Sequence, residues 1–232
     1  MIHIKAKLEL IYKSLYKIYG PQGWWPIIKK NSKDTGIACT YHPEDYHIPQ
    51  NKSQIYEICI GAILTQNTAW KNVEKALINL HQINGLNPKN INKINFEELK
   101  QAIRPAGYFN QKAKKIQQFN EFFQNLKNKT PSRENLLNVW GIGPETADSI
   151  LLYAYKQTSF VIDVYTKRIF SNLGLIDENM KYDEVKSIFE QNIKSDLIIY
   201  QEYHALIVEH AKNFYNKKSN YSKDPLIKIL QK

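Results

Sequence analysis

The stretch LNVWGIGPETADSILLYAYKQTSFVIDVYTKR, residues 137–168, places two glycines around one isoleucine and a lone aspartate, Asp163, farther along. Gly141 and Gly143 lie between two helical patterns, and glycine supplies the positive φ angles that a very tight turn needs. This pattern predicts a helix-hairpin-helix that points the backbone N–H groups of Gly141, Gly143 and Thr146 into one concavity at a helix N-terminus. Such a concavity can bind a phosphate, although a short glycine turn is also an ordinary corner in helical proteins.

Asp163 follows three apolar residues in the run FVIDVYTKR and precedes a helical pattern. It is therefore expected to be the N-cap of the next helix, and capping alone would explain its presence. A carboxylate that helix N–H groups keep ionised, beside a phosphate-binding hairpin, would also be a chemically competent anion facing DNA. The residues alone leave both interpretations open.

Helical periodicity dominates the chain, whereas no segment alternates convincingly with period two. Apolar residues recur at three- and four-residue spacing in segments 8–19, 55–80, 96–103, 113–126, 133–139, 145–155, 164–172, 182–191 and 197–214. The pattern predicts an all-α fold with short connections. Residues 29–52 are polar and rich in His and Pro, and we interpret most of this segment as a surface excursion.

The composition is that of an ordinary globular protein with a basic surface. The chain has 232 residues, 43% of them hydrophobic, and a formal net charge of +10. The charge favours an anionic partner such as nucleic acid, although a solvated basic surface would give the same balance. Its two cysteines, Cys39 and Cys59, lack the repeated spacing of metal sites. The sequence shows no secretion signal and no stretch of transmembrane length. We therefore expect a cytoplasmic, nucleoid-associated protein with reduced thiols and no membrane partner.

Several motifs together resemble one protein family. VWGIGPETAD followed by VIDVYTKRI resembles the helix-hairpin-helix, Gly/Pro-rich, aspartate superfamily of DNA glycosylases, in particular its endonuclease III branch. GAILTQNTAWKNVEKAL, IRPAGYFNQKAKKI and YHALIVEHAKNFY are similar to further elements of that branch. The resemblance implies a monomeric, two-lobed, all-α fold with an active-site cleft between the lobes. One lobe would comprise residues 1–52 and 160–232, and the other residues 53–159 with the helix-hairpin-helix at 133–155.

The sequence departs from the branch in two ways. Glu145 stands where bifunctional members have a lysine that attacks the sugar, and a carboxylate cannot form that imine, so we expect no strand-cleaving lyase activity. No cysteine follows Cys59, and aromatic residues such as Tyr215 and Tyr221 stand where many members of the branch have an iron-sulfur cluster, so we expect no cluster. We expect no other cofactor. A monovalent cation at the hairpin is compatible with this interpretation. Together with YGPQGWWP, these departures make the chain resemble the cluster-free members of the branch, described as 3-methyladenine DNA glycosylase III or endonuclease III-related proteins. That group excises alkylated purines.

The resemblance implies a role for each candidate residue in binding double-stranded DNA that contains a damaged base. Asp163 would stabilise an oxocarbenium-like sugar and position or deprotonate water. The pocket for the flipped base would be lined by Trp24, Trp25, Pro26, Trp70 and Lys223. DNA contacts are expected from Gln66, Asn67, Lys112, Gly141, Gly143, Glu145, Thr146, Lys167 and Arg168.

Some of these roles have plain structural alternatives. Trp24 and Trp25 could lock the N-terminal helix to the body, and Lys223 could be surface charge. Gln66 could be a helix-surface amide, and we expect it on one helical face with Trp70. The alternative functions are a glycosylase for oxidised or mismatched bases and a non-catalytic DNA-binding protein.

Overall fold

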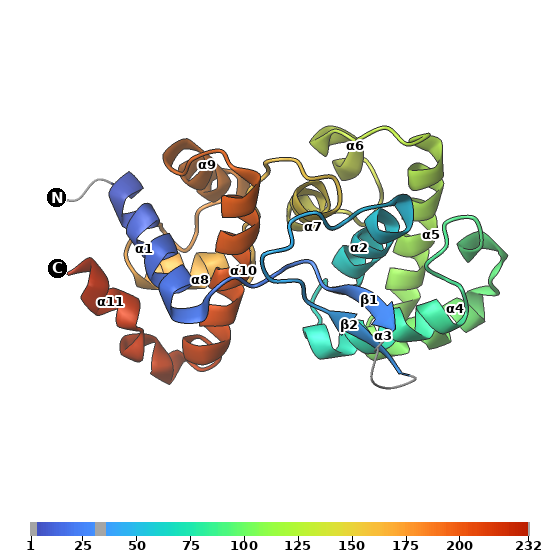
Figure 1. Cartoon of the computed structure of the whole chain (residues 1–232), viewed down its shortest axis with the longest axis horizontal. Helices are drawn as coiled ribbons and strands as arrows, with labels where there is room; N and C mark the ends of the chain where they lie inside the picture. The colour runs from blue at the N-terminus through green and yellow to red at the C-terminus, as the bar shows by residue number, and fades with distance from the viewer. Residues whose placement is uncertain (1–3, 31–35, 232) are drawn as a thin grey trace. The chain divides into compact units, whose positions relative to one another are not determined.

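The computed structural model describes residues 4–30 and 36–231, and most of them are helical (Figure 1). The α-helices are α1 (Ile4–Tyr19), α2 (Lys52–Leu64), α3 (Trp70–Gln82), α4 (Phe96–Ile103), α5 (Phe109–Asn125), α6 (Arg133–Leu137), α7 (Pro144–Ser149), α8 (Val164–Asn172), α9 (Tyr182–Asn192), α10 (Leu197–Phe214) and α11 (Pro225–Leu230). Short helical turns are η1 (Ile91–Lys93), η2 (Arg104–Ala106), the π-helical η3 (Ile150–Ala154) and η4 (Lys218–Lys223). The predicted helical fold is confirmed.

One small β-ribbon departs from the all-α prediction. Strands β1 (Ile27–Lys30) and β2 (Ile37–Thr40) pair antiparallel, with Ile27 opposite Thr40. The two strands have the sequences IIKK and IACT, which do not alternate apolar and polar residues, so neither segment shows a strand signal. The backbone N–H of Ile28 donates to Glu57 of α2 at 2.5 Å, and burial raises the pKa of this carboxyl to about 7. The ribbon is thus fixed to α2.

The expected single helix over residues 55–80 is wrong, because α2 and α3 are separate helices. Asn67, in the connection between them, has a φ of +51°, a left-handed conformation that asparagine tolerates better than most residues. The hydroxyl of Thr68 donates to the carbonyl of Ala106 at 2.5 Å and holds the break in place. Gln66 and Trp70 therefore do not share a helical face.

The chain divides into two compact units, which are described separately. The terminal unit comprises residues 1–24 and 157–232, and the central unit comprises residues 25–156. The segment 25–52 groups with the central unit, whereas the family resemblance implied a lobe of residues 1–52 and 160–232. In the central unit, α2 is buried at every position from Tyr56 to Leu64.

In the terminal unit, α1 packs along α10 (Figure 1). The hydroxyl of Tyr203 donates to the carbonyl of Leu8 at 2.9 Å. A stacked pair of rings, Phe160 and Phe189, with centroids 4.5 Å apart, forms the core next to Tyr203. This core supports the start of α8, where Asp163 lies.

A buried polar network holds the C-terminal segment, the region in which many members of the endonuclease III branch have cluster-binding cysteines and this chain has none. Asp224 accepts hydrogen bonds from the Tyr215 hydroxyl at 2.6 Å and the Leu226 N–H at 2.8 Å, and its carboxylate lies 2.9 Å from His210 Nε2. The other ring nitrogen of His210 bonds the hydroxyl of Tyr19 at 2.9 Å. Burial alone would raise the pKa of Asp224, but the bonds with His210 and Tyr215 lower it below its usual value. The network links α1, α10 and α11.

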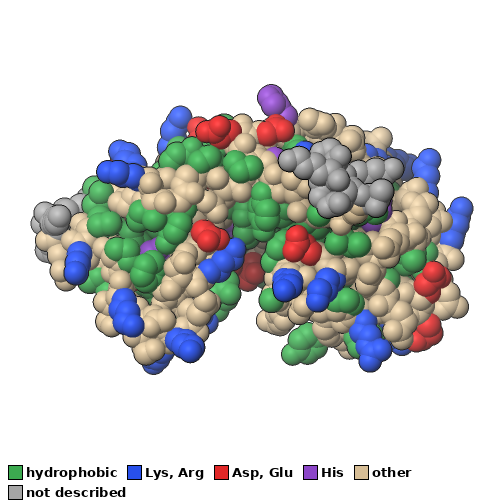
Figure 2. All heavy atoms as spheres, turned by 60° about the horizontal axis from the view of Figure 1, so that its bottom comes forward, with side chains coloured by type: hydrophobic (Ala, Val, Ile, Leu, Met, Phe, Trp, Pro, Cys, Tyr) green, Lys and Arg blue, Asp and Glu red, His purple; other side chains and the backbone are tan. Residues whose placement is uncertain are grey.

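The surface carries the basic charge that the composition predicts. Figure 2 shows Lys and Arg side chains spread over the face in view rather than gathered in one patch. Across residues 4–30 and 36–231, no helix is long and apolar enough to cross a membrane. The same residues include no group of three or more His, Cys, Asp or Glu side chains placed to hold a metal ion.

Candidate active site

The glycine hairpin lies between α6 and α7 in the central unit. Ser132 caps α6 through a reciprocal capping box with Asn135. Gly141 has a φ of +86°, which confirms the positive angle predicted there. Gly143 has a φ of −94° and a ψ of 177°, so the same prediction is wrong for Gly143, which is the extended N-cap of α7. Glu145 is exposed in the first turn of α7.

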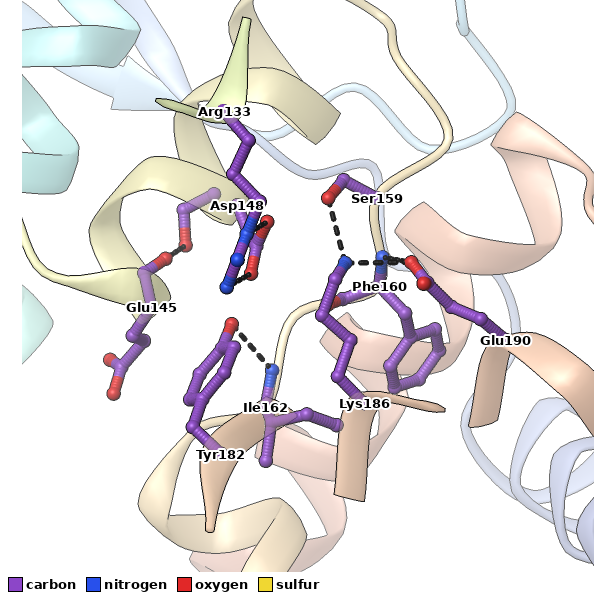
Figure 3. Close-up of polar contacts among 10 residues, drawn as sticks. Arg133, Glu145, Asp148, Ser159, Phe160, Ile162, Tyr182, Lys186 and Glu190 are labelled. Atoms are coloured by element: carbon purple, nitrogen blue, oxygen red, sulfur yellow. Dashed lines mark hydrogen bonds and ion pairs between the residues drawn. The ribbon is translucent and has the colours of Figure 1, made fainter. Parts of the chain in front are cut away.

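An ion pair joins the two helices of the hairpin. Arg133 of α6 donates from Nε to Asp148 Oδ1 of α7 at 2.9 Å and from Nη2 to Oδ2 at 3.3 Å (Figure 3). The Asp148 side chain is fully buried. Asp148 is therefore buried, although it lies on a short helix beside an exposed turn, and its charge is compensated inside the motif.

Gln66 contacts the hairpin directly. Its amide nitrogen donates to the carbonyl of Gly141 at 3.0 Å and to the hydroxyl of Thr146 at 2.9 Å. Its amide oxygen accepts from Lys115 at 2.5 Å. The structure thus brings Gln66, Gly141 and Thr146 together. If Gln66 entered a DNA duplex, it would have to break these hydrogen bonds.

Lys112 has an internal role instead of the expected phosphate contact. It is 2% exposed, and its ammonium donates to the carbonyls of Leu64 and Ala106 and to the hydroxyl of Thr68, at 2.6 to 2.8 Å. Burial, and secondarily the charge of Lys115, lower the pKa of Lys112 to about 8. The prediction for Lys112 is wrong because three internal acceptors already bind its ammonium. Asn67, by contrast, is exposed.

Asp163 caps α8, as predicted. Its Oδ1 accepts from the backbone N–H of Thr166 at 2.7 Å and from the Thr166 hydroxyl at 2.8 Å. Its side chain is 11% exposed, and Oδ2 lies 3.8 Å from Nε2 of His204 in α10. The carboxylate is therefore oriented by one oxygen, while the other faces a histidine.

The segment before Asp163 is held by α9. The N–H of Ile162 donates to the Tyr182 hydroxyl at 3.2 Å, and the N–H of Phe160 donates to Glu190 at 2.9 Å (Figure 3). Lys186 donates to Ser159 and Glu190 at 2.7 and 2.6 Å. These bonds fix the backbone that presents the carboxylate.

His204 lies beside Asp163, although no motif in the sequence indicates it. Its ring contacts Trp24 edge-on, with centroids 5.8 Å apart and an interplanar angle of 88°. Burial lowers the pKa of His204, although the charge of Asp163 acts in the opposite direction. Because α10 is buried on most sides, no periodicity in YHALIVEHAKNFY distinguishes His204. The terminal unit therefore places Trp24, His204 and Asp163 together.

Trp25 and its neighbours form a core in the central unit. The Trp25 ring contacts Trp70 at 5.5 Å and Tyr153 at 5.3 Å between centroids. A Cβ atom on Gly61 would lie 2.9 Å from the Trp25 indole nitrogen, so the helix needs a glycine there. Trp25 is 5% exposed and Pro26 is buried as well. Trp25 thus packs inside the central unit, and neither of these ring contacts involves the N-terminal helix that the structural alternative named.

The remaining basic candidates lie on the surface of the terminal unit. Lys167 donates to the carbonyl of Met180, and Arg168 donates to the carbonyl of Tyr215 at 3.1 Å. Both line a surface cavity of about 690 Å³ that Lys218 also borders. Lys223 does not line this cavity; it is exposed and donates to an asparagine side chain, Asn220.

Two aromatic residues of the central unit are more than half exposed. Tyr108 is 71% exposed at the start of α5, with a left-handed φ of +47°, and Trp140 is 53% exposed next to Gly141. Aromatic faces of this kind can stack on nucleic acid bases. Sequence alone does not separate them from the many aromatic residues of the core.

Comparison with known proteins agrees with this geometry. Residues 60–195 match the family model described as HhH-GPD superfamily base excision DNA repair protein. A Methanocaldococcus jannaschii protein that carries the provisional name DNA repair glycosylase MJ1434 is 46% identical over 228 residues, which cover 92% of each chain. The crystal structure of Helicobacter pylori 3-methyladenine DNA glycosylase (MagIII) bound to 1,N6-ethenoadenine is similar at a TM-score of 0.67 and 29% identity, over 90% of this chain and 97% of that one.

The fold is also shared with more distant proteins. A non-covalent endonuclease III–DNA complex matches at a TM-score of 0.74 and 17% identity, over 99% of this chain and 95% of that chain. At this identity the likeness concerns the fold. With the hairpin between α6 and α7 and the capping Asp163 in place, the chain belongs to the HhH-GPD superfamily of base excision DNA repair proteins and is a DNA repair glycosylase.

Proposed function

We propose that the chain is a monofunctional DNA glycosylase that flips alkylated purines out of double-stranded DNA and hydrolyses their N-glycosidic bond, with 3-methyladenine as the representative substrate. Asp163 stabilises the cationic sugar and directs water to its anomeric carbon. The observation that carries this proposal is the group of Trp24, His204 and Asp163, in which an aromatic ring and a carboxylate both contact one histidine.

The aromatic ring favours alkylated purines among damaged bases. Flipping a nucleotide costs a few kcal/mol, and stacking on an aromatic side chain recovers roughly 1 to 3 kcal/mol. A purine made cationic by alkylation gains a further cation–π term on the order of 0.5 to 2 kcal/mol. Such a base is also a good leaving group, so that a carboxylate without a separate acid is sufficient. The similarity to MagIII supports the same substrate class.

Glu145 underlies the prediction of a monofunctional mechanism. It is exposed at the start of α7, where an attacking amine would be needed for a Schiff base. Treating a reaction of the protein and alkylated DNA with borohydride should therefore trap no covalent adduct. A bifunctional glycosylase in parallel serves as the positive control on gel electrophoresis. An adduct as abundant as that of the control would contradict hydrolysis by water alone.

The two hairpin glycines give a matched test of phosphate binding. A Cβ atom on Gly141 would lie 2.5 Å from Lys115 Cγ, whereas one on Gly143 would have no atom within 4 Å. Gly141→Ala should destabilise the fold by about 1 to 2 kcal/mol, because φ is also positive. Gly143→Ala should keep the melting temperature and weaken DNA binding about tenfold, because its Cβ would obstruct only a bound phosphate chain. Fluorescence anisotropy with wild-type affinity for Gly143→Ala would contradict this role.

A panel of duplex oligonucleotides tests the proposed substrate class. Each duplex carries one alkylated purine, one oxidised base or one mismatch, and mass spectrometry quantifies the free base. We expect release of alkylated purines, including 3-methyladenine from methylated DNA, and no comparable release of the others. Preferential release of an oxidised or mismatched base would show that the proposed substrate class is wrong. Binding of DNA without release of any base would show that the protein is a DNA-binding protein and not a glycosylase.

A further inference from the structure

The two carboxylate oxygens of Asp163 have different surroundings. Oδ1 accepts two hydrogen bonds from Thr166 and belongs to the helix cap. Oδ2 lies 3.8 Å from His204 Nε2. Because Oδ1 is committed to the cap, Oδ2 is the oxygen that meets water or the sugar in the proposed reaction.

We propose that His204 is a positioning residue for this reaction, which packs against Oδ2 of Asp163 and against the Trp24 ring and thereby sets the carboxylate and the base platform relative to each other. This inference rests on the proposed function. It adds a residue that neither the hairpin nor the capping motif predicts. The His204 side chain is only 5% exposed and its Nε2 is buried away from solvent, so it does not reach the substrate itself. His204 therefore acts through Asp163 and Trp24.

The histidine suits this position because it stays neutral. A charged imidazolium would form an ion pair with Asp163 and reduce the negative potential available to the sugar cation. Burial opposes that charge and lowers the pKa of His204. A neutral ring leaves the charge of Asp163 in place, and a movement of about 1 Å would bring Nε2 within hydrogen-bond distance of Oδ2.

Helix α10 also fixes the backbone before Trp24. Glu202, two positions before His204, is 2% exposed. Its carboxylate accepts from the N–H of Gln22 at 2.8 Å and from the N–H of Gly23 at 3.5 Å. Trp24 is therefore held at two points by one helix, through its preceding backbone by Glu202 and through its ring by His204.

The test compares His204→Leu with His204→Gln, whose amide nitrogen can occupy the place of Nε2. Single-turnover release of 3-methyladenine from dimethyl sulfate-treated DNA is measured at saturating enzyme. Affinity is measured separately on a duplex with a tetrahydrofuran abasic analogue. We expect His204→Leu to lose about tenfold in the rate constant with affinity within about twofold of wild type, and His204→Gln to return to within about threefold of the wild-type rate.

His210→Gln is the matched control, because His210 is a buried histidine of the same helix that pairs with Asp224 instead of Asp163. It should lower the melting temperature and keep the rate constant. A wild-type rate for His204→Leu, or equal losses for the leucine and glutamine variants, would overturn the inference while leaving the proposed function intact. If the wild-type protein releases no base, the proposed function and the inference both fail.

Discussion

Replacing Asp163 with asparagine should reduce base release about a thousandfold while DNA binding and the melting temperature stay near wild type. Asparagine is as good an N-cap as aspartate, so the bonds from Thr166 to the side chain at the start of α8 can persist. The variant loses only the negative charge that faces the sugar cation and that can accept a proton from water. Single-turnover kinetics on methylated DNA, with anisotropy on an abasic analogue, measures both quantities.

Asp196→Asn provides a control for the loss of an N-cap charge. Asp196 caps α10 in the same unit and accepts from the N–H groups of Ile198 and Ile199. This variant should retain the wild-type rate of base release. Equal rates for Asp163→Asn and wild type would remove Asp163 from the chemistry and leave it as a cap alone.

Replacing Arg133 with methionine should lower the free energy of unfolding by about 3 kcal/mol. The variant leaves the fully buried carboxylate of Asp148 without its cation, and a buried unpaired charge is strongly destabilising. Removing one partner of a buried ion pair usually costs about 3 to 5 kcal/mol. Arg133 itself is partly exposed, with a side-chain exposure of 29%, so we expect a loss at the lower end of that range. Urea denaturation followed by circular dichroism gives the change in stability.

Two further variants test whether the loss of stability comes from the buried charge of Asp148 or from the loss of any ion pair. Arg133→Met combined with Asp148→Leu should recover most of the lost stability, because an apolar pair replaces both charges. Lys100→Met removes one partner of a pair whose carboxylate, Glu97, is 70% exposed, and should cost less than about 1 kcal/mol. Equal stability of Arg133→Met and Lys100→Met would contradict the structural role of the Arg133–Asp148 pair.

Local signals in the sequence were sufficient for much of the helical fold. The predicted segments 96–103, 164–172 and 197–214 have the bounds of α4, α8 and α10. Each of these helices follows an Asn or Asp that caps it in the structure, a signal that is visible in the sequence. Asp163 is one of these caps, so its place at the start of α8 was predictable.

Features that depend on distant residues were not predictable. The break between α2 and α3 contains no Gly or Pro and rests on the bond from Thr68 to Ala106, thirty-eight positions away. The burial of Lys112 depends on the same region. The charge of the buried Asp148 is compensated by Arg133, which lies fifteen positions earlier in the chain. His204 likewise becomes a site residue only through the packing of α10 beside Trp24 and Asp163.

The central claim is that water, directed by Asp163, hydrolyses the bond between an alkylated purine and its sugar. The most direct measurement is mass spectrometry of both products of one single-turnover reaction with wild-type protein and methylated duplex DNA. We predict free 3-methyladenine together with an unbroken strand that carries an abasic site. No free base, or a strand cleaved in step with base release, would contradict the account.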